Sequence, residues 1–212
     1  ALRDALELVA PLASKTTQPV EECCLAAILC FYKRDYRTAD MWVGKCIEKD
    51  NDWALPLELR GWIARYSNKL PLAVESFQIA AKQNAWNRGW LFALAARVSI
   101  QIGTPASIRV AERHCDSALA SDSTNPLAHA IRSEARQALG KYPMAVSGAL
   151  DTLSASGFCV QRLNDAAWLQ ATCPTEQGRN ARLALRLARK ACEQTNWKNP
   201  LFIDTLAAAY AE

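Results

Sequence analysis

Eight cysteines are the residues of this 212-residue chain that could most readily do chemistry. Cys23, Cys24, Cys30 and Cys46 are near one another in the sequence, and their thiolates could form a zinc or redox site if they converged in space. No two cysteines have the Cys-x-x-Cys spacing, however, and zinc sites usually use closely spaced ligand pairs. We therefore expect no metal site and no cofactor, and we expect the cysteines to be small buried hydrophobic residues in a reducing compartment, the cytoplasm.

Catalytic motifs are absent from the sequence as well. It contains no glycine-rich phosphate-binding loop, no His-Glu-x-x-His and no Gly-x-Ser-x-Gly. His114 and Cys115 combine a base with a nucleophile, but adjacent residues of a helix point about 100° apart and do not face each other. We therefore predict that the chain is not an enzyme.

The composition indicates which elements must position the remaining side chains. Alanine and leucine are abundant, whereas the chain has only eight glycines and nine prolines and almost no alternation of β-branched residues. Because alanine and leucine are good helix formers, the sequence predicts an all-α fold. The net charge of +4 is too small to indicate nucleic-acid binding, and no apolar run is long enough for membrane insertion.

Small residues recur along the sequence at intervals of 34 to 39 residues. In residues 39–52 and 73–86, an alanine is followed by an apolar residue four positions later and a small residue seven positions later. The alanines that begin this pattern are Ala5, Ala39, Ala73, Ala111, Ala145 and Ala184. A second column of small residues contains Ala27, Gly61, Ala95, Ser133, Ala167 and Ala207. Because small side chains let two helices approach closely, each repeat is predicted to be a pair of antiparallel helices.

This pattern resembles the tetratricopeptide repeat, a helix–turn–helix unit of 34 residues. The match is best in residues 54–87, at Leu57, Gly61, Ala73, Phe77 and Ala80, and it departs from the family at Arg60, Ala64 and Ala85. The resemblance implies one array over residues 1–212, an α-solenoid of stacked antiparallel helix pairs that forms a right-handed superhelix. Its predicted parts are the second helix of a partial repeat (1–19), five repeats (20–53, 54–87, 88–125, 126–159 and 160–199) and the first helix of a truncated repeat (200–212).

Both predicted ends fall within a repeat, and the last repeats look like those of large bacterial multidomain proteins. We therefore expect the chain to be a fragment of a longer, bacterial, multidomain protein. Solenoids normally end in a polar capping helix, so the truncated repeats predict possible end-to-end self-association.

The family binds partners in a groove lined by the first helix of each pair, so the resemblance implies a non-catalytic scaffold for a peptide or protein partner. The groove positions carried over onto this sequence include Glu58, Trp62, Arg65, Tyr66, Phe92, Glu134, Gln137, Asn164, Asp165, Trp168, Asp204 and Thr205. Trp62, Arg65 and Tyr66 are of the types that anchor interfaces, although Trp62 could instead pack between neighbouring helices. The alternative function is a structural spacer or a regulatory domain of an attached catalytic domain.

Some members of the family hold a peptide carboxylate with lysine and asparagine side chains. The corresponding positions here are Cys24, Ile28, Leu59, Gly89 and Ala93, so no such clamp is expected. Three tryptophans near the repeat junctions, Trp53, Trp86 and Trp197, are predicted to fill gaps between helices. A basic helix face is formed by Arg182, Arg186, Arg189 and Lys190, and it is either a solvated surface or a docking face for an anionic partner.

Overall fold

The computed structural model of the chain describes residues 19–156 and 159–212, and within these ranges it contains helices and no strand. The predicted all-α fold is therefore confirmed. The helix predicted at the start of the chain, with Ala5, falls on residues 1–18, which lie outside the described ranges. The chain divides into two compact units, which meet in sequence at Ile102 and Gly103.

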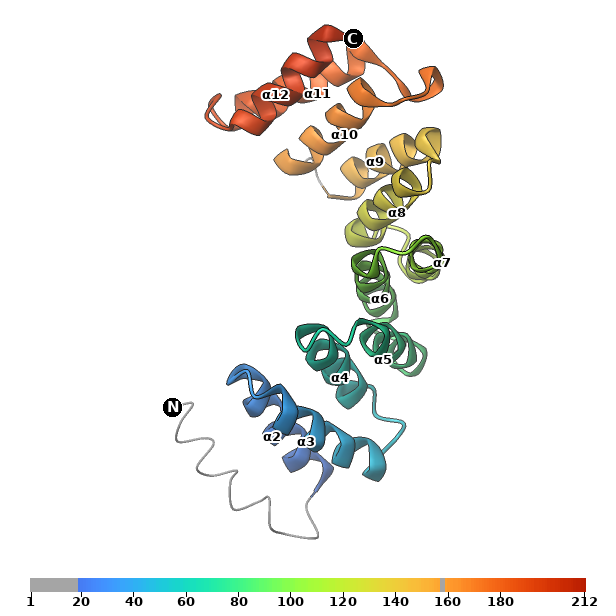
Figure 1. Ribbon diagram of the computed structural model, residues 1–212, viewed down its shortest axis with the longest axis vertical. Helices are drawn as coiled ribbons and strands as arrows, with labels where there is room; N and C mark the ends of the chain where they lie inside the picture. Colours follow the sequence, from blue (N-terminus) through green and yellow to red (C-terminus); the bar gives the residue numbers. More distant parts are fainter. Residues whose placement is uncertain (1–18, 157–158) are drawn as a thin grey trace. The chain divides into compact units, whose positions relative to one another are not determined.

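The first unit contains α2 (Val20–Tyr32), α3 (Tyr36–Lys49), α4 (Ala54–Tyr66), α5 (Leu70–Gln83) and α6 (Arg88–Ile102). Each helix packs against the next one in the sequence, as Figure 1 shows from α2 in blue to α6 in green. One cluster of buried hydrophobic residues joins α2, α3 and α4, and a second joins α4, α5 and α6. The first unit is thus a stack of helices with α4 shared by both clusters.

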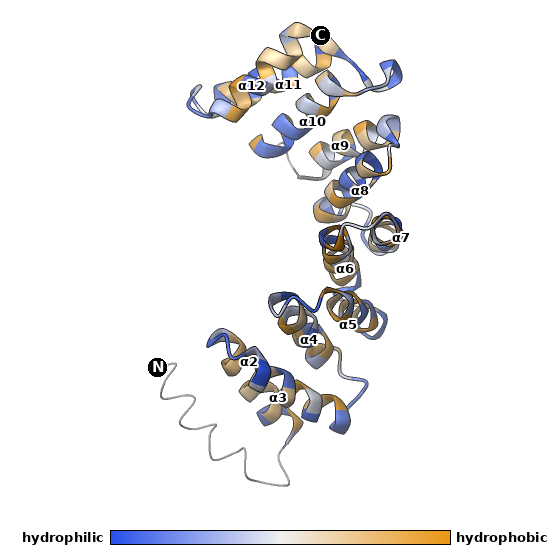
Figure 2. Ribbon diagram, viewed as in Figure 1, coloured by the Kyte–Doolittle hydropathy of each residue, from blue (hydrophilic) through white to orange (hydrophobic). Residues whose placement is uncertain are grey.

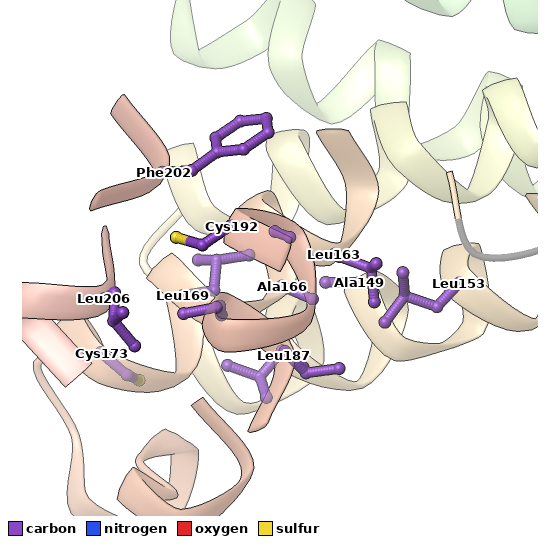
Figure 3. Packing of buried hydrophobic residues seen from close by; sticks show 14 residues of the cluster. Ala149, Leu153, Leu163, Ala166, Leu169, Cys173, Leu187, Cys192, Phe202 and Leu206 are labelled. Atoms are coloured by element: carbon purple, nitrogen blue, oxygen red, sulfur yellow. The ribbon is translucent and has the colours of Figure 1, made fainter. Parts of the chain in front are cut away.

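The second unit contains α7 (Pro105–Ser121), α8 (Pro126–Ala138), α9 (Tyr142–Ser156), α10 (Val160–Thr172), a short 3-10 helix η2 (Glu176–Gly178), α11 (Ala181–Gln194) and α12 (Pro200–Ala211). Helix α10 packs on α9, α11 and α12, while α8 packs between α7 and α9. Figure 3 shows the core of this unit, in which Leu163 and Leu169 of α10 lie among Leu187 of α11, Phe202 of α12 and Leu153 of α9. This core fixes the positions of the helices that carry the candidate site.

The small-residue columns explain why the helices stack. Ala39, Ala73, Ala111, Ala145 and Ala184 are all fully buried. At Gly61, an added Cβ atom would lie 2.6 Å from the ring of Phe77, so only glycine lets α4 approach α5 this closely. Ala207, by contrast, is exposed on α12. Figure 2 shows the resulting pattern, with hydrophobic helix faces and mostly hydrophilic turns between helices.

The turns of the pairs α2–α3, α4–α5 and α8–α9 share one backbone geometry. Arg34, Asn68 and Gly140 each follow the first helix of a pair with positive φ angles of 64°, 59° and 73°. Each turn is also closed by a backbone hydrogen bond across five residues, such as Lys141 N to Arg136 O at 2.8 Å. This is the left-handed helix ending that glycine and asparagine favour, and here arginine adopts it too.

The helix starts agree with the repeats predicted from the sequence. Helices α2, α4, α6, α8 and α10 begin at residues 20, 54, 88, 126 and 160, which are the first residues of the five predicted repeats. The division between the two compact units falls inside the third predicted repeat, after Ile102. The single array over residues 1–212 and its superhelical form therefore remain predictions.

Candidate functional site

The second unit contains a cavity of about 500 Å³ lined by residues of α8, α9, α10 and α12. Four of the predicted groove residues line it, namely Glu134 on α8 and Asn164, Asp165 and Trp168 on α10. Gln137, Asp204 and Thr205, which the family pattern also placed in the groove, line the same cavity. The structure therefore brings seven predicted groove residues of α8, α10 and α12 together around one cavity.

The hydroxyl groups of the cavity present only acceptors. Ser133 Oγ, Thr152 Oγ1 and Thr205 Oγ1 donate to backbone carbonyl oxygens at 2.6, 2.8 and 3.1 Å. All three residues are at least 95% buried. Since a hydroxyl has a single proton, each of these oxygens has only lone pairs left to offer a ligand.

The amide of Asn164 adds a further acceptor. Asn164 is 8% exposed, and its Oδ1 has no hydrogen-bond partner in the part of the chain that the structure describes. A buried polar atom without a partner costs about 1–3 kcal/mol, so each such atom in a native fold calls for an explanation. A ligand that donates a hydrogen bond to Oδ1 would remove this cost.

Three carboxylates surround this acceptor-lined interior. Asp165 accepts from Gln161 Nε2 at 2.9 Å and is paired with Arg162, whose guanidinium lies 3.2 Å away. Asp204 is exposed and has neither a hydrogen-bond nor an ion-pair partner among the described residues. Glu134 is exposed as well. With Arg162 as the one cation in the described lining, the cavity is net negative although the whole chain carries +4.

Trp168 supplies the apolar part of the site. Its side chain is 44% exposed, and Leu201 on α12, which lines the same cavity, is 68% exposed. An aromatic ring and an aliphatic side chain that flank polar groups form the combination that binding sites use most often. The cavity lining thus combines three carboxylates, three hydroxyl groups that can only accept, and an apolar flank.

The other predicted groove residues lie in the first unit and do not form one cavity there. Trp62 is half-buried and packs edge-on against Phe77 on α5, the second helix of its own pair, with ring centroids 5.4 Å apart. Arg65 lies over the ring of Trp62 at 5.6 Å. Tyr66 is 59% exposed and stacks on Tyr36, with centroids 6.0 Å apart.

Glu58 and Phe92 occupy separate places in the same unit. Glu58 lines a hollow of about 330 Å³ with Trp53, Leu55 and neighbouring residues of the α5–α6 turn. Phe92 is partly buried and packs against the cluster shared by α4, α5 and α6. Trp62 and Phe92 therefore contribute to packing, whereas Tyr66 is mostly exposed.

One sequence prediction about the junction tryptophans is wrong. Trp86 is 96% exposed and fills no gap between helices. Trp53 is partly buried against the cluster of α2, α3 and α4, as expected, and Trp197 is half-exposed. The four residues of the basic face of α11 are all exposed.

The cysteines behave as core residues in the described part of the chain. Seven are buried and only Cys159 is exposed. The Cys46 thiol donates to the carbonyl oxygen of Val20 at 3.7 Å. The neighbouring Cys24 thiol and burial raise the pKa of Cys46. Among the residues described, no three histidine, cysteine or acidic side chains converge as metal ligands, and Cys115 is fully buried beside a 7% exposed His114.

Sequence reasoning missed the contribution of the second helix of the pair. Ala149 and Thr152 on α9 line the cavity, although the family pattern assigns the groove to first helices. The signal was present in the repeat alignment, since Ala149 stands where Phe77 stands in the repeat at 54–87. A small residue at that position leaves space that a phenyl ring fills elsewhere.

No family model matches the sequence, and no curated protein is detectably similar to it. Several solved structures have the same arrangement of helices. YrrB, described as a TPR protein with an unusual peptide-binding site, matches with a TM-score of 0.68 at 16% identity over 92% of this chain and 96% of that chain. The C-terminal part of a TPR repeat-containing protein from Cytophaga hutchinsonii matches with a TM-score of 0.77 at 18% identity over 98% and 80%.

The chain has the tetratricopeptide-repeat fold. The resemblance stated from the sequence is thus confirmed at the level of the fold. A third structure with this fold is the Pyrococcus horikoshii signal transduction ATPase with numerous domains, which has a tetratricopeptide repeat sensor. It matches with a TM-score of 0.75 at 13% identity, over 98% of this chain and 36% of that chain. None of the described helices is both long enough and apolar enough to span a lipid bilayer.

Proposed function

We propose that this tetratricopeptide-repeat chain is a protein-interaction module that binds an extended peptide segment of a partner in the cavity of its second unit. The observation that carries the proposal is the cavity itself, about 500 Å³ in volume, whose lining includes the exposed Trp168 and Asn164, the Oδ1 of which is buried without a hydrogen-bond partner among the described residues. YrrB, a protein of the same fold, is described as having a peptide-binding site, which adds support.

The physical basis is the match between an extended peptide and this lining. A peptide in extended form exposes backbone N–H groups, which can donate to buried acceptors such as Asn164 Oδ1. Its side chains alternate in direction, so one can enter the cavity while its neighbours contact the rim. Tryptophan is enriched among the interface residues whose change to alanine weakens binding by about 2 kcal/mol or more, and Trp168 is of this type.

Selection from a phage library of random 12-residue peptides on the immobilised 212-residue chain tests the proposal. The selection is repeated on two variants, Ala149→Phe, which places a ring in the cavity, and Trp168→Ala, which removes the apolar flank. We expect a set of peptides to be enriched on the wild-type chain and lost from both variants. Circular dichroism establishes that each variant retains its helices.

Trp197→Ala is the matched control, because Trp197 is 50% exposed in the same unit and does not line the cavity. It should select the same peptides as the wild-type chain. Equal enrichment on the wild-type chain and both cavity variants, or no enrichment on any of them, would contradict the proposed site.

The alternative is a spacer or a regulatory domain beside a catalytic domain. The sensor of the Pyrococcus horikoshii ATPase gives this alternative a precedent in the same fold. It predicts no cavity-dependent peptide selection, so the same experiment separates the two functions.

A further inference from the structure

We infer that the peptide segment bound in the cavity of the second unit places a lysine or arginine side chain there, between Glu134, Asp165 and Asp204. This inference rests on the proposed peptide-binding function and specifies the chemistry of its ligand. It concerns only the second unit, whose helices α8, α9, α10 and α12 supply the whole lining.

The charge of the lining is the first argument. Three carboxylates line the cavity, and the single guanidinium among the described lining residues, that of Arg162, is already paired with Asp165 at 3.2 Å. Asp204 has no counter-ion in the described part of the chain. The surplus of negative charge is local, because the chain as a whole carries +4. A cation from the partner is the complement that Asp204 lacks among the described residues.

The hydrogen-bonding capacity of the interior is the second and independent argument. Ser133, Thr152 and Thr205 have all donated their hydroxyl protons to backbone oxygens, so they can only accept. Asn164 Oδ1 is also an acceptor and has no partner among the described residues. The ammonium of lysine has three donors and the guanidinium of arginine has five, and neither has an acceptor. Either group would therefore satisfy this interior without leaving a buried acceptor unpaired.

The apolar flank fits the stem of the same side chains. Lysine and arginine carry a chain of three or four methylene groups that pack along apolar surface while the charged end reaches polar groups. Trp168, 44% exposed, and Leu201, 68% exposed, offer such a surface beside the carboxylates. A cation near the ring of Trp168 would gain a further attraction to its π electrons.

The volume also suits one long side chain with part of its backbone. The cavity of about 500 Å³ lies within the range of roughly 300–1,000 Å³ that is usual for sites that enclose a small ligand. A negatively charged peptide is disfavoured, because it would meet both the carboxylates and the acceptor-only hydroxyls. The site thus selects against the ligands that a carboxylate-binding clamp would prefer.

The test begins with the peptides selected on the wild-type chain and lost on Ala149→Phe. Their content of lysine plus arginine is compared with that of the unselected library, and we expect an excess of at least about twofold. A fluorescein-labelled synthetic copy of one such peptide is then titrated with the full chain, and binding is followed by fluorescence polarisation.

Charge variants of Asp204 give the decisive comparison. Asp204→Lys should weaken binding by roughly tenfold or more, as expected for a lost charged hydrogen bond and an added repulsion, and Asp204→Asn by less. Glu193→Lys is the matched control, since it makes the same charge change at an exposed position of the same unit outside the cavity, and it should bind within about twofold of wild type. A peptide with its lysine or arginine changed to glutamate should bind Asp204→Lys better than it binds the wild-type chain.

The outcomes separate the inference from the proposed function. Cavity-dependent peptides with no excess of lysine or arginine, or equal effects of Asp204→Lys and Glu193→Lys, overturn the inference and leave peptide binding intact. An absence of cavity-dependent peptides overturns both.

Discussion

The helix pair α4–α5 of the first unit and the pair α8–α9 of the second place small residues at the same repeat positions. The first pair has a filled core, whereas the second lines a cavity. In each, a small residue on the first helix lies sixteen positions before a residue on the second, as Gly61 before Phe77 and Ser133 before Ala149. The Phe77 ring fills the space beside Gly61 and is in turn covered by Trp62. Ser133 and Ala149 fill less, and both line the cavity. In these two helix pairs, the large side chain of Phe77 fills the position beside the first helix, whereas the small side chain of Ala149 lines a cavity there.

The two units also share an ion pair that joins successive repeats. Asp40 pairs with Lys69 at 3.7 Å in the first unit, and Glu112 pairs with Lys141 at 2.6 Å in the second. Both pairs are separated by 29 residues and begin one residue after an alanine of the buried column. The pair in the second unit is closer, and Arg136 adds a second cation at 3.2 Å from Glu112.

The largest loss of stability is expected when the first unit loses the Phe77 ring that fills the space beside Gly61. Phe77→Ala should lower the free energy of unfolding by about 3–5 kcal/mol, because it leaves a cavity in a core where Phe77 is fully buried. Urea denaturation measures the loss, and hydrogen exchange should rise in residues 19–102. A loss below about 1 kcal/mol would show that the two helix pairs do not differ in the way described.

A change at the small residue of the same contact comes next. Gly61→Ala should destabilise the chain by about 1–3 kcal/mol, because the new Cβ would lie 2.6 Å from the Phe77 ring. Gly44→Ala is the control within the same unit, since nothing lies within 4 Å of its added Cβ. Alanine is the better helix former, so that variant should be stabilised by roughly 0.5–1 kcal/mol.

The corresponding glycine-to-alanine change in the second unit, at Gly148, should destabilise the chain less than Gly61→Ala does. At Gly148, the added Cβ would lie 3.4 Å from Ser133 Cβ, which is an ordinary contact. Gly148→Ala is therefore expected to change the unfolding free energy by less than about 1 kcal/mol in thermal or urea denaturation. An effect as large as that of Gly61→Ala would contradict the looser packing of α8 on α9.

The turns of the two units predict effects of opposite sign. Gly140 has a φ angle of 73°, so Gly140→Ala should cost about 1 kcal/mol in the second unit, although nothing lies near its added Cβ. Arg34 has a φ angle of 64°, and Arg34→Gly should therefore gain a few tenths to about 1 kcal/mol in the first unit. Melting temperatures that move in the same direction for both variants would argue against backbone strain as the cause.

The smallest effect concerns the pH dependence of the second unit. Burial raises the pKa of Glu112, but hydrogen bonds from Lys141 and Arg136 outweigh it and hold the pKa below its ordinary value of 4.5. Because the folded pKa is the lower one, the stabilisation is present above about pH 4.5 and is lost as the pH falls through the folded pKa. Glu112→Gln should therefore lose about 0.5–1 kcal/mol at pH 7 and less at pH 3, which urea denaturation at both pH values can measure.

Much of the fold was predictable because it depends on residue size at fixed spacing. Ala39, Ala73, Ala111, Ala145 and Ala184 are buried because only small side chains let two helices lie this close, and such a requirement is visible in one sequence. The failure at Trp86 has the opposite cause. Whether a large side chain in a turn meets the core depends on the path of the turn, which the repeat pattern does not contain.

The candidate site was only partly predictable for a related reason. The family pattern named Glu134, Asn164, Asp165 and Trp168 among the groove positions, but residue type favoured Trp62, Arg65 and Tyr66 as the residues that anchor a partner. The sequence could not show that the first group surrounds a cavity whereas Trp62 covers Phe77. That difference depends on the volume left by residues of neighbouring helices, chiefly Ala149.

By itself, the sequence determined that this chain is built from paired helices, because a helix pair needs small residues at regular intervals and polar residues in its turns. Tertiary structure alone decided where space remains between the pairs and which polar atoms there lack a partner. Packing is the sum of many contacts from several helices, so no single repeat contains that information. The acceptor-lined cavity beside Asn164 is therefore a property of α8, α9, α10 and α12 together.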